Sequence, residues 1–223
     1  MRIRHGRIAL ELHQVRRGDG PALLLLHGLY EESASWGEAP AVWAGSIYAL
    51  DFSGHGRSEW LTGGGYTPEL LAADADAALA QIGRAALAGA GVGAYVALLL
   101  AGTRPELVPA ALLLSGAGLA GGGAQPDFTG PRFPLLDSPA PDEPPASETT
   151  RHDPLVRALA RDVRPPDYAA PFAHAARRLL LLEDGTPRPP WWQAVRQAPG
   201  AQTVAADLHL AFTRLAQLYG EQG

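Results

Sequence analysis

Short apolar runs alternate with segments of helical spacing along most of the chain. Ala22–Leu26 is apolar at every position, as expected for a strand that is buried on both faces. Arg7–Val15 alternates apolar and polar residues, which predicts an antiparallel edge strand. Pro68–Ile82 has helical spacing, with Thr67 as a suitable N-cap and Pro68 at the first helical position. Further strands are expected over Ser46–Asp51, Ala85–Ala88, Ala110–Leu114, Leu179–Leu182 and Gln202–Ala205, and further helices over Ser33–Trp43, Ala94–Ala101, Trp191–Gln197 and Ala211–Gly220.

Buried strands that alternate with amphipathic helices predict an α/β fold, with a mainly parallel central sheet and helices on both faces. After residue 117 the chain becomes rich in glycine and proline and poor in large apolar side chains, apart from a possible short helix over Pro154–Asp162. We therefore expect a core formed by residues 1–117 and 177–223. A short, irregular cap is expected over residues 118–176.

Composition narrows the range of partners. The chain has 223 residues, 47% of them hydrophobic, which suffices for one domain with a full core. The net charge is −5 without a basic block, so nucleic acid is not an expected partner. The sequence contains no cysteine, which excludes disulfides and thiolate metal sites, and we expect no metal or other cofactor. The N-terminus lacks the apolar run of a signal peptide, and no apolar run reaches membrane length, so we expect a cytoplasmic protein without a membrane partner.

Residues suited to a binding site follow several of the expected strands. His27 follows one buried strand, Asp51 ends another, and the glycine-rich turn Gly89–Gly93 follows a third. Ligands of parallel α/β sheets bind at the carboxyl ends of the strands. These three segments therefore predict a single site at one edge of the sheet.

The turn Gly89–Gly93 lies between an apolar strand and an apolar helix. Its spacing is that of the nucleophile elbow G-x-S-x-G, in which a strained turn presents the serine above the sheet. Here Gly91 occupies the position of the serine. A phosphate-binding loop is not favoured, because no Lys-Ser/Thr pair follows the glycines.

With these motifs in order, the chain resembles α/β-hydrolase-fold proteins of the small esterase and haloperoxidase-like type. The resemblance implies the α/β-hydrolase fold with a short cap between its two core segments. It rests on Leu23–Gly28 with Trp36, the D-x-x-G-x-G-x-S turn Asp51–Ser58, the elbow and helix Gly89–Ala101, the turn Arg104–Val108, and His209 after the last expected strand.

The family mechanism uses a serine, a histidine and an acid. Carried onto this sequence, the resemblance places the nucleophile position at Gly91, which is vacant, and the histidine at His209. A surface histidine at the start of the last helix is the alternative for His209. The acid is assigned to Asp184, with Glu183 as the alternative.

The resemblance also implies an oxyanion hole, formed by the backbone N–H groups of Leu29 and Val92. His27 and Tyr30 are expected near its mouth. Backbone donors remain when the nucleophile side chain is lost, so a pocket for a carbonyl or carboxylate group is predicted. Gly91 is further expected to leave room for a water molecule.

Other candidate residues have structural alternatives. Tyr95 is expected to pack in the helix interface, and the Trp191-Trp192 pair to cover the core or to line the entrance. Ser53 and Ser58 are expected to make local backbone hydrogen bonds.

Three functions follow from these residues. The first is a catalytically degenerate protein that binds a small carbonyl or carboxylate ligand. The local run Gly89–Tyr95 is similar to that of the N-myc-downstream-regulated family, whose members are regarded as non-enzymatic. The second is an active hydrolase or lyase on a small ester-like substrate, in which His209 activates water. The third is an interaction module.

Loss of a triad nucleophile costs roughly 10⁶-fold in kcat, which favours the degenerate protein. Replacing Gly91 by serine is expected to restore esterase activity if the rest of the triad is in place.

Overall fold

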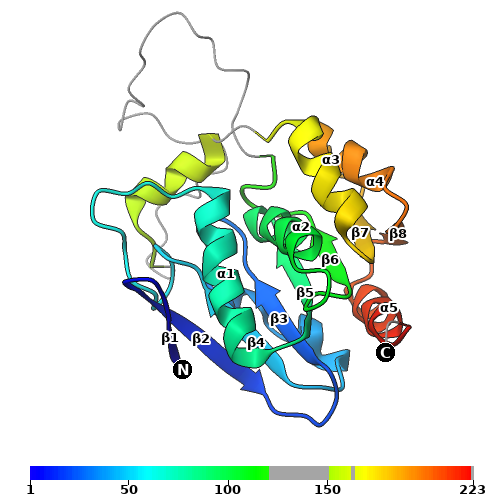
Figure 1. Ribbon diagram of the computed structural model, residues 1–223, viewed down its shortest axis with the longest axis horizontal. Coiled ribbons are helices and arrows are strands. Elements are labelled where there is room, and N and C mark those ends of the chain that lie inside the picture. The colour runs from blue at the N-terminus through cyan, green and yellow to red at the C-terminus, as the bar shows by residue number, and fades with distance from the viewer. Residues whose placement is uncertain (121–150, 162–163, 222–223) are drawn as a thin grey trace, which may run out of the picture.

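The computed structural model describes residues 1–120, 151–161 and 164–221, which form an eight-stranded sheet with helices on both faces (Figure 1). The strands lie in the order β1-β2-β4-β3-β5-β6-β7-β8; β1 and β2 are antiparallel to their neighbours and the other six are parallel. The strands are β1 Arg2–His5, β2 Ile8–Arg16, β3 Ala22–Leu26, β4 Ile47–Asp51, β5 Ala85–Ala90, β6 Ala111–Leu114, β7 Leu179–Glu183 and β8 Ala201–Ala205. The α-helices are α1 Pro68–Ile82, α2 Val92–Thr103, α3 Pro166–Ala175, α4 Pro190–Arg196 and α5 Leu208–Gly220, and the 3₁₀ helices are η1 Ser33–Trp36, η2 Ala39–Val42 and η3 Pro154–Arg161.

The sheet separates two apolar cores, because successive side chains of a strand point to opposite faces. In β3, Leu24 and Leu26 pack in the core beneath α1 and α2, which lie in front of the sheet in Figure 1. Leu23 and Leu25 pack in the second core, with side chains of α5 and η2. This double coverage explains the continuous apolar run of β3 and confirms the predicted fold class.

Most elements form where the spacing predicts them. Helix α1 has the predicted bounds, and Thr67 Oγ1 accepts a hydrogen bond from the Leu70 N–H at 3.2 Å. Two differences have local causes. The strand predicted over Arg7–Val15 is not at the edge, because β1 pairs outside it. The predicted helix over Ser33–Trp43 is two short 3₁₀ helices separated at Gly37, which has a φ of 49°.

The predicted cap, residues 118–176, is only partly described, because residues 121–150 and 162–163 lie outside the described residues. The expected helix near residue 154 is η3. Helix α3 is an addition to the expected irregular structure, and it contains Pro171. Across the described part of the chain, no helix combines the length and apolar character needed to cross a membrane.

Candidate functional site

The turn from β5 to α2 has the geometry of a tight strand-to-helix elbow. Gly91 has a φ of 56° and a ψ of −124°, and its N–H donates to the Leu114 carbonyl at 3.2 Å. A Cβ on Gly89 would lie 2.1 Å from the Gly93 oxygen, and a Cβ on Gly93 would lie 2.2 Å from the Leu26 oxygen. The two outer glycines are therefore required by the close approach of α2 to β5 and β3.

The middle glycine is in contact with a different segment. Residues Ser115–Leu119, which we call the plug segment, follow β6 and lie against the elbow. A Cβ on Gly91 would lie 1.9 Å from the carbonyl oxygen of Ala117. The space expected to hold a water molecule is thus filled by this carbonyl group. A serine side chain at position 91 would meet the same carbonyl group, which opposes the recovery of activity expected for this change when the rest of the triad is in place.

The backbone N–H groups of Leu29 and Val92 converge on one oxygen atom. Both donate to the carbonyl of Ala117, each at 3.0 Å. Two N–H donors aimed at one oxygen, beside the start of a helix, have the geometry that the sequence leads us to expect of an oxyanion hole. The amino end of α2 adds a partial positive charge. In this structure the oxygen belongs to the chain itself.

Two buried side chains also donate hydrogen bonds to the plug segment. Arg164 Nη1 donates to the Gly118 carbonyl at 2.8 Å, and Trp191 Nε1 donates to the Leu119 carbonyl at 3.0 Å. Tyr95 lies between them, with its ring centroid 5.1 Å from that of Trp191 and 5.0 Å from the Arg164 guanidinium carbon. Tyr95 of α2 and Trp191 of α4 are both buried, and their rings pack against each other.

His209 is the second residue of α5 and is exposed to solvent. Its side chain makes no hydrogen bond to any described residue. Leu208, and not His209, lines the cavity beside the elbow. This position corresponds to the alternative of a surface histidine at the start of the last helix.

Asp184 is held in a polar cluster at the ends of β6 and β7. Its carboxylate accepts hydrogen bonds from the Ser115 hydroxyl, from the N–H and hydroxyl of Thr186, and from Arg188 Nη2 at 2.8 Å. Desolvation acts to raise the pKa of Asp184, but these hydrogen bonds and the Arg188 charge outweigh it and hold the pKa well below its usual value. The structure thus joins Asp184 to Ser115 and not to His209.

Glu183, the alternative acid, also lies apart from His209. Its Oε1 atom accepts a long hydrogen bond of 3.5 Å from Trp192 Nε1 and lies 3.9 Å from Arg196 Nη1.

A cavity of about 360 Å³ lies beside the elbow. It is mainly apolar, with Ala90 contributed by the elbow strand and Ser115 by the plug segment. Leu29, Val92 and Ala117 are not among its lining residues. The cavity is lined by Glu31, Ser35, Trp36, Ala39, Ala90, Leu114, Ser115, Leu182 and Leu208.

His27 and Tyr30 are buried and line neither of the two described cavities. His27 Nδ1 donates to the Gly28 carbonyl at 2.7 Å, and Nε2 accepts from the Phe52 N–H at 3.2 Å, which fixes a neutral tautomer. Burial lowers the pKa of His27 to about 4. Tyr30 has a φ of 65°, and its ring centroid lies 5.1 Å from that of His152.

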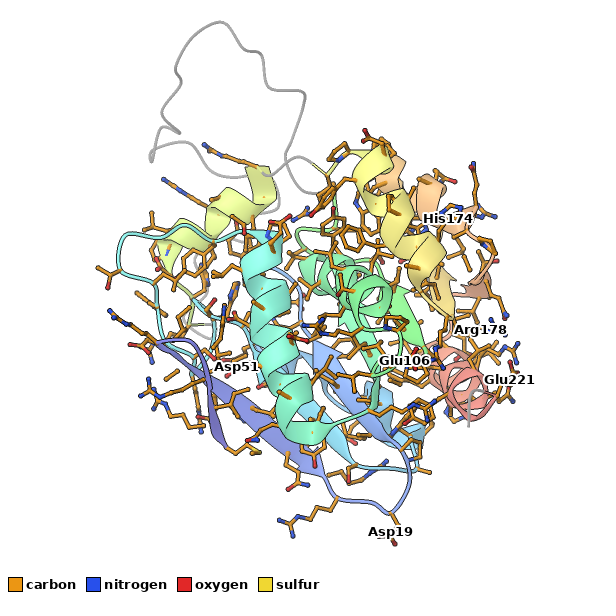
Figure 2. All side chains as sticks on the ribbon, in the orientation of Figure 1. Asp19, Asp51, Glu106, His174, Arg178 and Glu221 are labelled. Carbon is orange, nitrogen blue, oxygen red and sulfur yellow. The ribbon has the colours of Figure 1, made fainter. Side chains whose placement is uncertain are left out.

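A second cavity, of about 480 Å³, lies against β2 and η1 and includes no residue of the elbow. Asp51, the last residue of β4, is among its lining residues and is labelled in Figure 2. The Asp51 carboxylate accepts hydrogen bonds from the Ser33 N–H, the Arg57 N–H and His13 Nε2 at 2.8, 2.9 and 3.0 Å. Burial acts to raise the pKa of Asp51, but these bonds outweigh it and lower the pKa.

Asp51 therefore fastens η1 and β2 to the turn that follows β4. Ser58 of this turn makes the expected local bond, because its hydroxyl donates to the Asp51 carbonyl. Ser53 donates instead to the Asp74 side chain at 2.6 Å. Within the described ranges, no three His, Cys, Asp or Glu side chains are grouped to hold a metal ion.

Comparisons with known proteins agree with this geometry. The sequence profile of the alpha/beta hydrolase family matches residues 23–220. The chain belongs to this family. No curated protein matches the chain at a significant level.

Among solved structures, the hypothetical protein PA1622 from Pseudomonas aeruginosa PAO1 is 19% identical, with a TM-score of 0.69 over 100% of this chain and 98% of that chain. Est1E from Butyrivibrio proteoclasticus, bound to ferulic acid, is 17% identical, with a TM-score of 0.66 over 100% and 98% of the two chains. A monoacylglycerol lipase from Paleococcus ferrophilus is 19% identical, with a TM-score of 0.65 over 94% and 99%. At these identities the likeness shows a shared fold over nearly the whole length.

Proposed function

We propose that this member of the alpha/beta hydrolase family is catalytically degenerate and binds a small carboxylate or carbonyl compound at its elbow. The observation that carries the proposal is the pairing of Gly91 with two intact donors. The Leu29 and Val92 N–H groups both bind the Ala117 carbonyl oxygen at 3.0 Å, and Gly91, which lies beside that oxygen, has no side chain. The site can bind an oxygen but cannot attack the carbon attached to it.

A relocated nucleophile would have to come from a residue beside the elbow. Ser115 and Ser35 both line the cavity there; Ser115 belongs to the plug segment, and its hydroxyl donates to Asp184. A carboxylate whose pKa is held well below its usual value is a poor base for a serine hydroxyl. This geometry argues against Ser115 as a relocated nucleophile.

Activation of water by His209 is also not supported. No histidine is among the residues that line the cavity beside the elbow, and the His209 side chain is exposed. A general base must be within hydrogen-bond reach of the water it activates, directly or through one further water. A protein of the same fold also binds a carboxylic acid: the structure of Est1E holds ferulic acid. This supports a carboxylate as the ligand class.

The proposal is tested with the purified chain and two sets of reagents. We expect no labelling by a fluorophosphonate probe and no hydrolysis of p-nitrophenyl acetate or butyrate above the buffer rate. We also expect a panel of short carboxylates, amides and esters to contain compounds that raise the melting temperature. Labelling of a serine, or turnover that His209→Ala abolishes, would show that the protein is an enzyme.

A further inference from the structure

We propose that the Ala117 carbonyl is an internal ligand of the Leu29 and Val92 N–H groups, and that a small monocarboxylate binds by displacing it. This inference rests on the proposed binding function. It specifies the ligand class and the way in which access to the site is controlled.

The two donors need an acceptor whether or not a ligand is present. Leu29 and Val92 are fully buried, and an unsatisfied buried N–H is unfavourable. Ligand binding is therefore an exchange of one acceptor for another. Ala117 is half-buried and Gly116 is exposed, so the displaced carbonyl can form hydrogen bonds with water.

This exchange of acceptors favours a negatively charged ligand over a neutral one. A neutral ester or amide would replace one carbonyl by another and gain little. A carboxylate forms charge-assisted hydrogen bonds, which are about twice as strong as neutral ones. The amino end of α2, a helix of 12 residues, further favours an anion.

Two acidic side chains near the site limit the charge of the ligand. Glu31 lines the adjoining cavity, and its carboxylate accepts the Gly28 N–H at 3.0 Å. Asp184 lies behind Ser115, where Arg188 Nη2 at 2.8 Å offsets its charge. These carboxylates disfavour di- and trivalent anions and leave the N–H pair for a single carboxylate group.

The cavity beside the elbow suits the rest of the ligand. Its volume of about 360 Å³ lies in the range of small-molecule sites. Leu114, Leu182 and Leu208 provide apolar walls. Movement of the plug segment would connect this cavity to the N–H pair, so the fitting compounds are short aliphatic or aromatic monocarboxylates.

The anchors of the plug segment set how readily it opens. Arg164 and Trp191 donate to the carbonyls of Gly118 and Leu119 and do not contact the Ala117 carbonyl that occupies the N–H pair. A ligand that binds only the open form has an apparent affinity reduced by the small population of that form. Weakening an anchor should therefore tighten ligand binding without any new contact to the ligand.

The first test is a ¹H–¹⁵N NMR titration of the full chain with sodium butyrate, sodium benzoate and, as a neutral match, butyramide. The carboxylates are expected to shift the amide signals of Leu29, Val92 and the plug segment. Butyramide is expected to bind at least tenfold more weakly. Unchanged Leu29 and Val92 signals at saturation, or equal affinity for butyramide, would overturn the inference.

The second test compares two neighbouring tryptophans. Trp191→Phe removes the hydrogen bond to the Leu119 carbonyl, and we expect the Kd for butyrate to fall roughly threefold to tenfold. Trp192→Phe is the matched control, because Trp192 is equally buried but its N–H contacts Glu183. We expect its Kd to stay within about twofold of the wild type, as one hydrogen bond outside the plug does not alter opening. Equal effects of the two variants on the Kd would contradict control of binding by the plug segment. The NMR titration of the wild type tests binding at Leu29 and Val92 without either variant.

The outcomes separate this inference from the proposed function. If carboxylates shift the Leu29 and Val92 signals but bind no more tightly than butyramide, or leave the plug-segment signals in place, the ligand binds at the elbow and only the displacement of Ala117 is wrong. If a compound raises the melting temperature but leaves the Leu29 and Val92 signals in place, it binds away from the elbow, and the proposed binding site is wrong as well. If the chain hydrolyses esters or reacts with the fluorophosphonate probe, the proposed function itself is wrong.

Discussion

Glycine can be required by its backbone angles or by a lack of space beside it, and both apply to Gly91. Its φ of 56° is a region that residues with a side chain rarely adopt, and the Ala117 oxygen occupies the place of a Cβ. The difference between this turn and a serine elbow is therefore more than one missing side chain. The segment after β6 is packed into the space that a side chain would need.

We predict that Gly91→Ala and Gly91→Ser each destabilise the protein by at least about 3 kcal/mol, from backbone strain and displacement of the Ala117 carbonyl. Gly91→Ser should also show no esterase activity. Urea unfolding and p-nitrophenyl butyrate hydrolysis measure the two effects.

Gly6→Ala is the matched control, because Gly6 has a φ of 57° but nothing within 4 Å of the added Cβ. Gly6→Ala should lower the free energy of unfolding by only about 1–2 kcal/mol, because alanine must adopt the left-handed conformation. Equal costs at the two positions would show that the contact with Ala117 carries no energy.

At the scale of the element, the close packing of α2 on α3 depends on Gly102. A Cβ on this residue would lie 2.6 Å from the Phe172 Cα and 2.6 Å from its carbonyl oxygen. Alanine stabilises an open helix position by up to about 1 kcal/mol relative to glycine. Here it must push two helices apart, so packing opposes helix propensity.

We predict that Gly102→Ala destabilises the protein by about 1–3 kcal/mol, because the backbone of α3 cannot move aside as a side-chain tip can. Gly220→Ala provides the comparison, since Gly220 ends α5 with open space around it. It should be neutral or stabilising by up to about 1 kcal/mol. Thermal unfolding of both variants measures the difference, and a stabilising Gly102→Ala would contradict the close packing.

The elements themselves show which parts of the fold local pattern can predict. Strand β3 is a continuous apolar run and helix α1 has helical spacing behind a Thr67 N-cap, so their bounds follow from the sequence. Strand β1 has one buried apolar residue, Ile3, between charged neighbours, so it has almost no period to detect. Helix α3 contains Pro171, which normally argues against a helix, and it forms because its packing against α2 overrides that preference.

The candidate site divides in the same way. The elbow could be located from sequence because the spacing of Gly89, Gly91 and Gly93 is local. The contacts of Ala117 could not, because a backbone carbonyl has no residue type and its donors lie far away in the chain. The one available signal is the pair of glycines that flank Ala117. A Cβ on Gly116 would lie 2.9 Å from the Gly91 nitrogen, so a small residue is needed there.

At the scale of the whole molecule, buried histidines tie stability to pH. His27 and His55 are both fully buried, with ring centroids 5.0 Å apart, and His55 belongs to the turn that follows β4. Burial lowers the pKa of His27 to about 4 and, together with the neighbouring His27, lowers that of His55 well below its usual value. The nearby Asp51 charge opposes both shifts, and His152 adds to the shift of His55.

Because both pKa values are lowered on folding, the neutral histidines favour the folded state above pH 6.5, and this contribution is lost as the pH falls toward 4. A shift of this size in His27 corresponds to about 3 kcal/mol. Asp74 has the opposite effect. Burial raises its pKa, so protonation at low pH removes the unfavourable buried charge and stabilises the folded state. We predict a net fall in unfolding free energy between pH 6.5 and 4.

Urea unfolding at pH 7.5, 6, 5 and 4.5 measures this fall, and two variants assign it. His27→Gln should be less stable than the wild type at pH 7.5, because the Gly28 and Phe52 hydrogen bonds are disturbed, but its stability should change less with pH. His209→Gln should reproduce the wild-type slope, because the His209 side chain is exposed and makes no hydrogen bond to any described residue. A flat wild-type profile, or a slope that disappears in His209→Gln, would mean that buried neutral histidines are not the source of acid sensitivity.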